Sequence, residues 1–216
     1  MFGLKSRRKK ALIGDEVSFD IDSICKGHHK VTYKGVKAIR SPFDYLIYQM
    51  ILWEVKPDLV IEIGTNTGGG ALYLADLMET FGFGQLHSID IIKQSDPSLE
   101  RHPRIKLFYE GWEKYDIDEA RGFSKILVIE DASHVYEDTL NALNKFSELV
   151  SSGSYLIVED GIINELGMEK EYRGGPLKAI REFLTNHPDY IVDRKWCDFF
   201  GINATFNVNG FLKRVD

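Results

Sequence analysis

Short apolar runs rich in valine, isoleucine and leucine alternate along the chain with stretches in which apolar residues recur every three or four positions. The first pattern indicates buried strands and the second indicates helices. The predicted strands cover residues 58–63, 85–90, 104–111, 125–131, 154–160, 190–193 and 210–215. The predicted helices cover residues 41–56, 70–81, 113–121, 135–150 and 177–186. Because strands and helices alternate, we expect an α/β fold with a doubly wound, mainly parallel sheet and helices on both faces.

Residues 1–30 follow neither pattern and are predicted to form an irregular N-terminal tail and lead-in, which leaves residues 31–216 as a single domain. A short extended piece is expected within residues 33–40. Ser41 and Pro42 are residue types of a helix N-cap and first turn. Asp44 stands three residues after Ser41, where an acidic side chain reaches back to the cap.

The first strand of the domain leads into a glycine-rich loop that contains Gly64 and Gly68. A strand, a tight loop and a helix N-terminus form the first half of a nucleotide-binding βαβ unit. Asn66 occupies the position of the second glycine in the dinucleotide fingerprint, and no Lys-Ser or Lys-Thr pair of a P-loop follows. Glu62 places a negative charge just before Gly64, which suits a cationic ligand better than a phosphate. S-adenosylmethionine fits, because it carries a sulfonium, an ammonium and a ribose but no phosphate.

The next two strand ends carry residues that suit the rest of this ligand. Asp90 ends the second strand, where an acidic side chain accepts hydrogen bonds from ribose hydroxyls in nucleotide-binding units. Gly111 ends the third strand, beside the expected place of the adenine ring, and Trp112 is positioned to cover that ring. The alternative interpretation is that Glu62 and Asp90 are ordinary strand-end carboxylates.

Three more carboxylates are expected to converge, because Asp131 ends the fourth strand and Glu159 and Asp160 end the fifth. Neighbouring carboxylates repel one another unless a cation lies among them. Oxygen donors without cysteine favour Mg²⁺ or a similar hard ion over zinc. His134 follows Asp131 by three residues, and an imidazole titrates in the range that suits a general base. Glu130 is expected on the opposite face of its strand. The alternative is that these are unrelated polar turn residues.

Charge and cysteine content limit the classes of binding partner and the cellular compartment that we expect. The formal net charge is −6, which argues against a nucleic-acid partner. Basic residues between Lys5 and Lys10 are interpreted as part of a solvated tail. The two cysteines, Cys25 and Cys197, have no metal-binding or disulfide spacing, so a reducing cytoplasm is predicted. No apolar run approaches the roughly 20 residues of a transmembrane helix.

The chain from about residue 30 to residue 215 resembles the cephalosporin hydroxylase / rhamnosyl O-methyltransferase family. The matching motifs are Tyr33-Lys-Gly, Ser41-Pro-Phe-Asp, Tyr48-Gln, Pro57-Asp, Glu62-Ile-Gly-Thr and the three glycines at 68–70. The resemblance implies a Rossmann-like, class I S-adenosylmethionine-dependent methyltransferase fold. It also implies Mg²⁺ ligands at Asp131, Glu159 and Asp160, and a catalytic histidine at His134. Gly70 departs from the serine that is frequent in the family, and residues 161–175 match a segment that is expected to act as a lid.

The family name does not imply an oxygenase here. A non-haem iron site needs two histidines and a carboxylate on one metal. The chain offers His187-Pro-Asp189 without a further histidine after it, and this segment is interpreted as a helix end and a turn.

The sequence therefore predicts an Mg²⁺-dependent O-methyltransferase that acts on a small-molecule hydroxyl, such as that of a sugar or another vicinal diol. Glu62, Gly64, Thr65, Gly68 and Asp90 are expected to hold S-adenosylmethionine. Two alternatives stay open: an NAD-dependent oxidoreductase, and a non-catalytic cofactor-binding subunit of a partner enzyme. A homo-oligomer is possible, and the acceptor is not identified by any motif.

Overall fold

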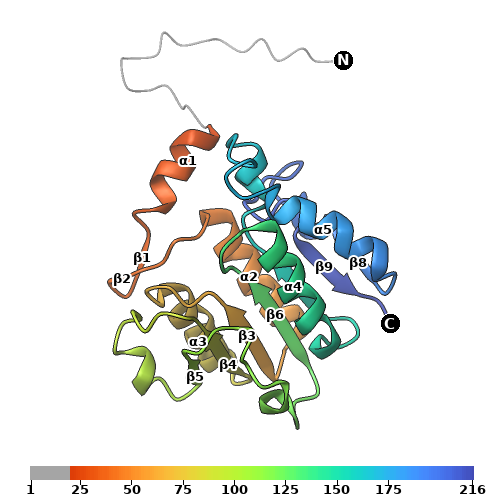
Figure 1. Ribbon diagram of the computed structural model, residues 1–216. Coiled ribbons are helices and arrows are strands. Elements are labelled where there is room, and N and C mark those ends of the chain that lie inside the picture. The colour runs from red at the N-terminus through yellow and green to blue at the C-terminus, as the bar shows by residue number, and fades with distance from the viewer. Residues whose placement is uncertain (1–19) are drawn as a thin grey trace, which may run out of the picture.

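The structure is a computed structural model that describes residues 20–216. Its main sheet has seven strands in the order β5-β4-β3-β6-β7-β9-β8 (Figure 1). The strands are β3 (Leu59–Ile63), β4 (Gln85–Ile89), β5 (Ile105–Phe108), β6 (Ile126–Glu130), β7 (Tyr155–Val158), β8 (Tyr190–Val192) and β9 (Phe211–Arg214). Strands β3 to β7 pair in parallel, and β9 runs antiparallel between β7 and β8. The predicted doubly wound, mainly parallel sheet is confirmed.

The direction of winding reverses at the centre of the sheet. From β3 the chain proceeds outward to β4 and β5, and it then returns to place β6 and β7 on the other side of β3. Loops after β3 and β6 therefore diverge at this point, and ligands of such sheets bind beyond the carboxyl ends of the strands there. The predicted cofactor loop follows β3, and the first predicted metal ligand follows β6.

Helices cover both faces of the sheet. They are α1 (Ile21–His28), α2 (Pro42–Val55), α3 (Gly69–Phe81), α4 (Tyr136–Phe146), α5 (Gly175–Asn186) and α6 (Arg194–Cys197), with 3₁₀ turns η1 (Leu99–Arg101), η2 (Ile117–Ala120), η3 (Ser147–Leu149) and η4 (Gly161–Asn164). A hydrophobic core lies on each face of the sheet, and alternate residues of β3 point into one or the other. Leu59, Ile61 and Ile63 pack with residues of α4 and α5, and Val60 packs with residues of α2 and α3. This period of two is the one expected of a strand buried on both faces.

The lead-in to the sheet is more ordered than the sequence predicted. The prediction of an irregular segment through residue 30 is wrong for α1, which begins after Asp20. The Asp20 carboxylate caps α1 by accepting from the Ser23 N–H at 2.7 Å. The expected extended piece is an antiparallel pair of two-residue strands, β1 (Thr32–Tyr33) and β2 (Val36–Lys37). The basic residues between Lys5 and Lys10 lie outside the described residues.

The predicted role of Asp44 at the start of α2 is wrong. Ser41 has the N-cap position and Pro42 begins the helix, but no side-chain hydrogen bond caps it. The fully buried Asp44 carboxylate instead accepts from the Thr205 hydroxyl and from the Phe206 N–H, the latter at 3.0 Å. Asp44 thus ties α2 to the segment before β9, a partner that local spacing does not reveal.

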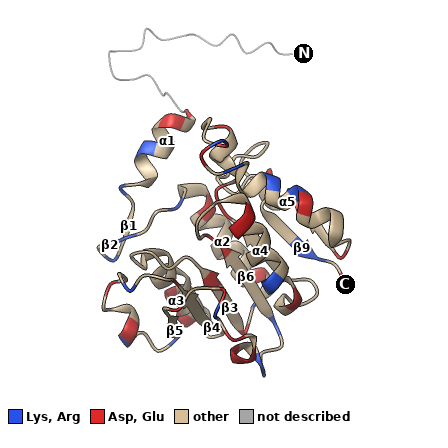
Figure 2. Ribbon diagram, in the orientation of Figure 1, with Lys and Arg blue, Asp and Glu red and all other residues tan. Residues whose placement is uncertain are grey.

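Charge is spread over the surface rather than gathered on one face. Figure 2 shows lysine and arginine positions interspersed with aspartate and glutamate positions along the described ribbon. In residues 20–216 no helix is long and apolar enough to cross a membrane.

Candidate active site

A cavity of about 650 Å³ opens beyond the carboxyl ends of the central strands. Its wall includes nearly every residue that the sequence predicted for the site: Glu62, Gly64, Thr65, Gly68, Asp90, Gly111, Trp112, Asp131, His134 and Asp160. Glu159 is the exception and does not line the cavity. The wall also includes Phe206, three residues at the end of α1 (Cys25, His28 and His29) and five of the segment after β7 (Ile162, Ile163, Leu166, Met168 and Tyr172).

The glycine-rich loop packs tightly against the loop after β6. Gly64 has φ +108°, and its N–H donates to the Ile89 carbonyl at 2.8 Å. A Cβ on Gly64 would lie 2.0 Å from the Asp131 carbonyl oxygen, which is well inside contact distance. Gly68 has φ +91° and begins α3 as its N-cap. Gly64 is therefore required both by backbone conformation and by space.

Gly64→Ala is expected to destabilise the fold by roughly 3 kcal/mol or more, because backbone atoms must move to admit the methyl group. Gly82→Ala is the matched control. Gly82 also has a positive φ, +79°, but a Cβ there meets nothing within 4 Å, so only the conformational cost of about 1 kcal/mol applies. Urea unfolding of both variants measures the difference. Equal losses in the two variants would contradict the close approach of Gly64 to Asp131.

Glu62 is held at the base of the cofactor part of the cavity. Its side chain is 2% exposed, and its Oε2 accepts from the Ser88 hydroxyl at 2.7 Å. The Thr65 and Ser88 hydroxyls are also 2.7 Å apart. Burial raises the pKa of Glu62 to about 7, although Arg40 and Ser88 act in the opposite direction. A positively charged ligand nearby would favour the ionised form of this carboxylate.

Asp90 organises the turn after β4. Its Oδ2 accepts from the Asn66 N–H at 2.7 Å, and its Oδ1 accepts from the Ile92 N–H at 3.0 Å. Each carboxylate oxygen has further acceptor capacity, so these bonds leave room for ribose hydroxyls. They fix the carboxylate between the glycine-rich loop and the exposed side chain of Ile91, which also lines the cavity.

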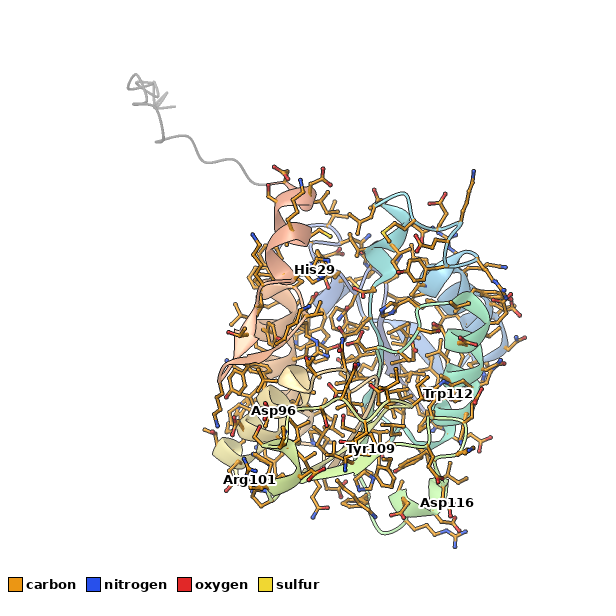
Figure 3. All side chains as sticks on the ribbon, turned by 60° about the vertical axis from the view of Figure 1, so that its left-hand side comes forward. His29, Asp96, Arg101, Tyr109, Trp112 and Asp116 are labelled. Atoms are coloured by element: carbon orange, nitrogen blue, oxygen red, sulfur yellow. The ribbon has the colours of Figure 1, made fainter. Side chains whose placement is uncertain are left out.

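Gly111 and Trp112 close the same end of the cavity. Gly111 has φ +82°, and a Cβ there would lie 2.6 Å from Ile91 Cγ2. Trp112 lies beside α4 (Figure 3), whose Lys145 Nζ donates to the Trp112 carbonyl at 2.9 Å. The positions agree with a place for an adenine ring between the two strand ends, and that role stays a prediction.

Asp131, His134 and Asp160 form a second cluster in the same cavity. One ligand atom from each residue lies within 4.8 Å of those of the other two. His134 Nε2 is 3.2 Å from Asp160 Oδ2 and 4.0 Å from Asp131 Oδ1. His134 and Asp160 both have left-handed backbone conformations, with φ +59° and +56°. Such conformations cost free energy in non-glycine residues and are enriched at functional sites.

Glu159 is turned away from this cluster. Its carboxylate receives two hydrogen bonds from the Arg40 guanidinium, from Nε at 3.1 Å and from Nη2 at 2.5 Å, and one from the Tyr48 hydroxyl at 2.8 Å. Arg40 Nη2 also lies 3.5 Å from Asp131 Oδ2 and 3.7 Å from Glu62 Oε1. The role of Glu159 as a metal ligand stays a prediction. Glu159 could take this role only if its ion pair with Arg40 opened.

Arg40 and Tyr48 are the site residues that sequence reasoning missed. Arg40 is 4% exposed and carries the positive charge shared by Glu62, Asp131 and Glu159. In the sequence it stands alone before a helix start, where an arginine is ordinarily solvent-exposed. Tyr48 has the helical spacing of the apolar residues of α2 and is interpreted there as part of the core. No local signal distinguishes either residue.

The remaining carboxylate, Glu130, stays out of the cluster, in agreement with its predicted position on the opposite face of the strand from Asp131. It is 1% exposed, and its Oε1 accepts from the Ala132 N–H at 3.3 Å. Burial raises the pKa of Glu130 to about 7. The folded chain therefore retains a proton that the unfolded chain releases between about pH 4.5 and pH 7, and the free energy of unfolding falls as the pH rises through that window.

Glu130→Gln is expected to remove this titration, because the amide oxygen still accepts the hydrogen bond. The pH dependence of unfolding should flatten between about pH 5 and pH 7, and at about pH 7.5 the variant should exceed the parent protein by roughly 1 to 3 kcal/mol. Urea unfolding across this range measures both effects. Glu148→Gln at an exposed site is the control, and identical pH profiles for the two variants would contradict the assignment.

The donor set fits a hard divalent cation. Asp131 and Asp160 offer carboxylate oxygens, and His134, the predicted base, lies on the same side of the cavity. The other ring nitrogen of His134, Nδ1, is buried without a hydrogen-bond partner. Burial and the Glu159 and Asp160 carboxylates raise the pKa of Asp131, so a nearby cation would relieve an unfavourable accumulation of negative charge.

Comparisons with known proteins point in one direction. Residues 25–215 match the family model described as Rhamnosyl O-methyltransferase/CmcI. The chain is 34% identical over 213 residues to a rhamnosyl O-methyltransferase of Mycobacterium leprae (strain TN), covering 89% of this chain and 91% of that relative. A solved structure described as "cmcI-D160 Mg-SAM" is 23% identical with a TM-score of 0.65, covering 87% of this chain and 78% of the other. Another, "cmcI-N160 SAH", is 20% identical with a TM-score of 0.68, covering 95% and 97%.

Proposed function

The chain belongs to the Rhamnosyl O-methyltransferase/CmcI family, and on this basis we propose that it transfers a methyl group from S-adenosylmethionine to a hydroxyl of a sugar or another vicinal diol. The observation that carries the proposal is one cavity with two parts. The glycine-rich loop and Asp90 lie on one side, and Asp131, His134 and Asp160 lie on the other. The parts touch where Gly64 packs against the Asp131 carbonyl.

The first part suits the methyl donor. Glu62 supplies a buried negative charge for the cationic end of S-adenosylmethionine, and Asp90 has free acceptor capacity for its ribose. Gly64, Thr65 and Gly68 form the loop between them, and Gly111 and Trp112 would contact the adenine. The name of the similar structure "cmcI-D160 Mg-SAM" agrees with this assignment.

The second part suits Mg²⁺ and the acceptor. Asp131 and Asp160 would hold the ion, with Glu159 as the further predicted ligand once Arg40 releases it. When bound, a hard divalent ion lowers the pKa of a coordinated hydroxyl and orients it. The relative's name supports a sugar as the acceptor class, and adjacent sugar hydroxyls suit a bidentate contact.

His134 is proposed as the general base. Its Nε2 faces the cavity between Asp131 and Asp160 and would take the proton of the acceptor hydroxyl. Asp160, 3.2 Å away, would stabilise the resulting imidazolium. The deprotonated oxygen would then be placed to accept the methyl group, because S-adenosylmethionine, when bound, would supply a methyl carbon on a sulfonium that can leave as a neutral thioether. Most of the remaining rate enhancement comes from holding donor and acceptor in line.

Calorimetry with the purified chain tests the cofactor assignment. S-adenosylmethionine is expected to bind, and NAD is not. Asp90→Asn should weaken S-adenosylmethionine binding about 10- to 100-fold, because one oxygen that accepts from ribose becomes an amide donor. Asp189→Asn, away from the cavity, is the control. Binding of NAD in preference to S-adenosylmethionine would favour an oxidoreductase, and binding of neither would favour a non-catalytic scaffold.

The acceptor is identified by transfer of a labelled methyl group to a panel of free and glycosidic sugars, with products assigned by mass spectrometry. Substrates with two adjacent hydroxyls are expected to react, and their singly deoxygenated analogues are expected to react at least about tenfold more slowly.

The 161–175 segment is proposed to act as a lid over the cavity.

The compartment and partners remain our proposals. Cys25 and Cys197 are both free thiols, in keeping with a reducing cytoplasm. The negative net charge disfavours a nucleic-acid partner. A homo-oligomer is compatible with the fold, and light scattering of the purified chain measures it.

A further inference from the structure

The last turn of α1 presents a second group of metal-binding side chains. Cys25, His28 and His29 are three and four residues apart, so they project from the same side of the helix. One ligand atom from each lies within 4.8 Å of those of the other two. All three residues line the cavity. Figure 3 labels His29 at this end of α1.

His28 is already oriented as a ligand would be. Its Nδ1–H donates to the Cys25 carbonyl at 2.5 Å, so Nε2 is the nitrogen left with a free lone pair. The ring is 8% exposed and packs edge-on against Phe206, with centroids 5.0 Å apart. A backbone carbonyl that accepts from the second ring nitrogen is a common companion of metal-bound histidine, because it fixes the tautomer and the ring orientation.

We propose that Cys25, His28 and His29 form a binding site for Zn²⁺. One sulfur and two imidazoles are the donors that zinc prefers, whereas Mg²⁺ requires oxygen. Tetrahedral zinc separates its donor atoms by about 3.4 to 3.8 Å, so small side-chain rotations suffice to close the observed group. On binding, the Cys25 thiol loses its proton to solvent and the thiolate coordinates the ion.

The site has three protein ligands and therefore one open position, which the placement of these residues directs toward the cavity. The Asp160 carboxylate is close enough to interact electrostatically with both Cys25 and His28, and its charge favours a dication there. A zinc ion bound by these three side chains would therefore present its open position to the cavity, where a further ligand could coordinate it. This site is separate in chemistry from the oxygen-rich cluster of Asp131 and Asp160, and the proposal does not depend on methyl transfer.

Cobalt spectroscopy of the full, reduced chain tests the site. Co²⁺ alone is added in the absence of Mg²⁺ and S-adenosylmethionine, and Zn²⁺ is then used to displace it. A saturable thiolate-to-cobalt charge-transfer band is expected, because Co²⁺ adopts zinc sites. Cys25→Ser should abolish the band, and His28→Ala should weaken Co²⁺ binding by on the order of 100-fold.

The chain offers matched controls. It has two cysteines, and Cys197 is fully buried in the other core, so Cys197→Ala should keep the band. His187→Ala should also keep it. Asp131→Asn tests whether the band comes from the oxygen-rich cluster instead, and this variant should leave the thiolate band unchanged. Absence of a thiolate band in the parent protein, or its persistence in Cys25→Ser, would overturn the proposal.

Discussion

Asp131→Asn is expected to lower kcat for methyl transfer by on the order of 1,000-fold or more, because the variant loses a carboxylate that is proposed to hold the divalent ion and that adds negative charge near His134. S-adenosylmethionine affinity should change by no more than about threefold, since the Gly64 contact uses the Asp131 backbone carbonyl and not its side chain. Initial rates over a range of Mg²⁺ concentrations, with calorimetry for the cofactor, measure the two quantities separately.

Asp118→Asn is a suitable control, because Asp118 lies in η2 on the surface and pairs with the exposed Arg121. It should leave both rate and affinity unchanged. Asp160→Asn should resemble Asp131→Asn. If the Asp131 variant kept full activity with the same metal dependence, the proposed role of this cluster would be lost, while the cofactor assignment would stand on its binding data.

Arg40→Met is expected to destabilise the fold by about 3 to 5 kcal/mol. Arg40 is the cation among the carboxylates of Glu62, Asp131 and Glu159, and removing one partner of a buried ion pair leaves uncompensated charge. Burial already raises the pKa of Glu62 to about 7, so protonation at lower pH removes part of that charge. The loss in the free energy of unfolding caused by Arg40→Met should therefore become smaller as the pH falls from about 8 to about 6. Urea unfolding at both pH values measures it.

Arg121→Met supplies the comparison at an exposed pair, where losses stay below about 1 kcal/mol. The double variant Arg40→Met/Glu159→Gln should recover at least about 1 kcal/mol relative to Arg40→Met, because the closest unpaired carboxylate is gone. If the double variant lost as much free energy of unfolding as Arg40→Met and Glu159→Gln lose together, direct pairing of the two residues would be contradicted. Added Mg²⁺ should also stabilise Arg40→Met more than the parent, since a divalent ion can replace the missing charge.

The order of strands and helices was predictable because burial on both faces forces nearly continuous apolar runs in β3, β6 and β7. These runs, and the shorter one in β4, each end at or beside a predicted site residue, so Glu62, Asp90, Asp131 and Asp160 could be placed at one edge of the sheet. The structure brings these residues to one cavity. Their proximity follows from parallel pairing, which sequence alternation already indicates.

What could not be predicted depends on contacts between distant segments. Arg40 and Glu159 are separated by 119 positions and meet in a buried pair, and Asp44 meets Thr205 across 161 positions. No local pattern in the sequence predicts either of these contacts. By contrast, α1 was missed although Asp20 offers a recognisable cap, because only a short amphipathic stretch follows it.

The contact between Gly64 and the Asp131 carbonyl also bears on how the acceptor range could be altered by engineering. The proposed donor and metal parts of the cavity meet at this contact, so a substitution there is expected to change both at once. The α1 helix and the segment from Ile162 to Tyr172 belong to neither strand end, yet they line the same cavity. Libraries that aim at new acceptors should therefore vary positions such as Leu166, Met168 and Tyr172, which line the cavity outside the glycine-rich loop.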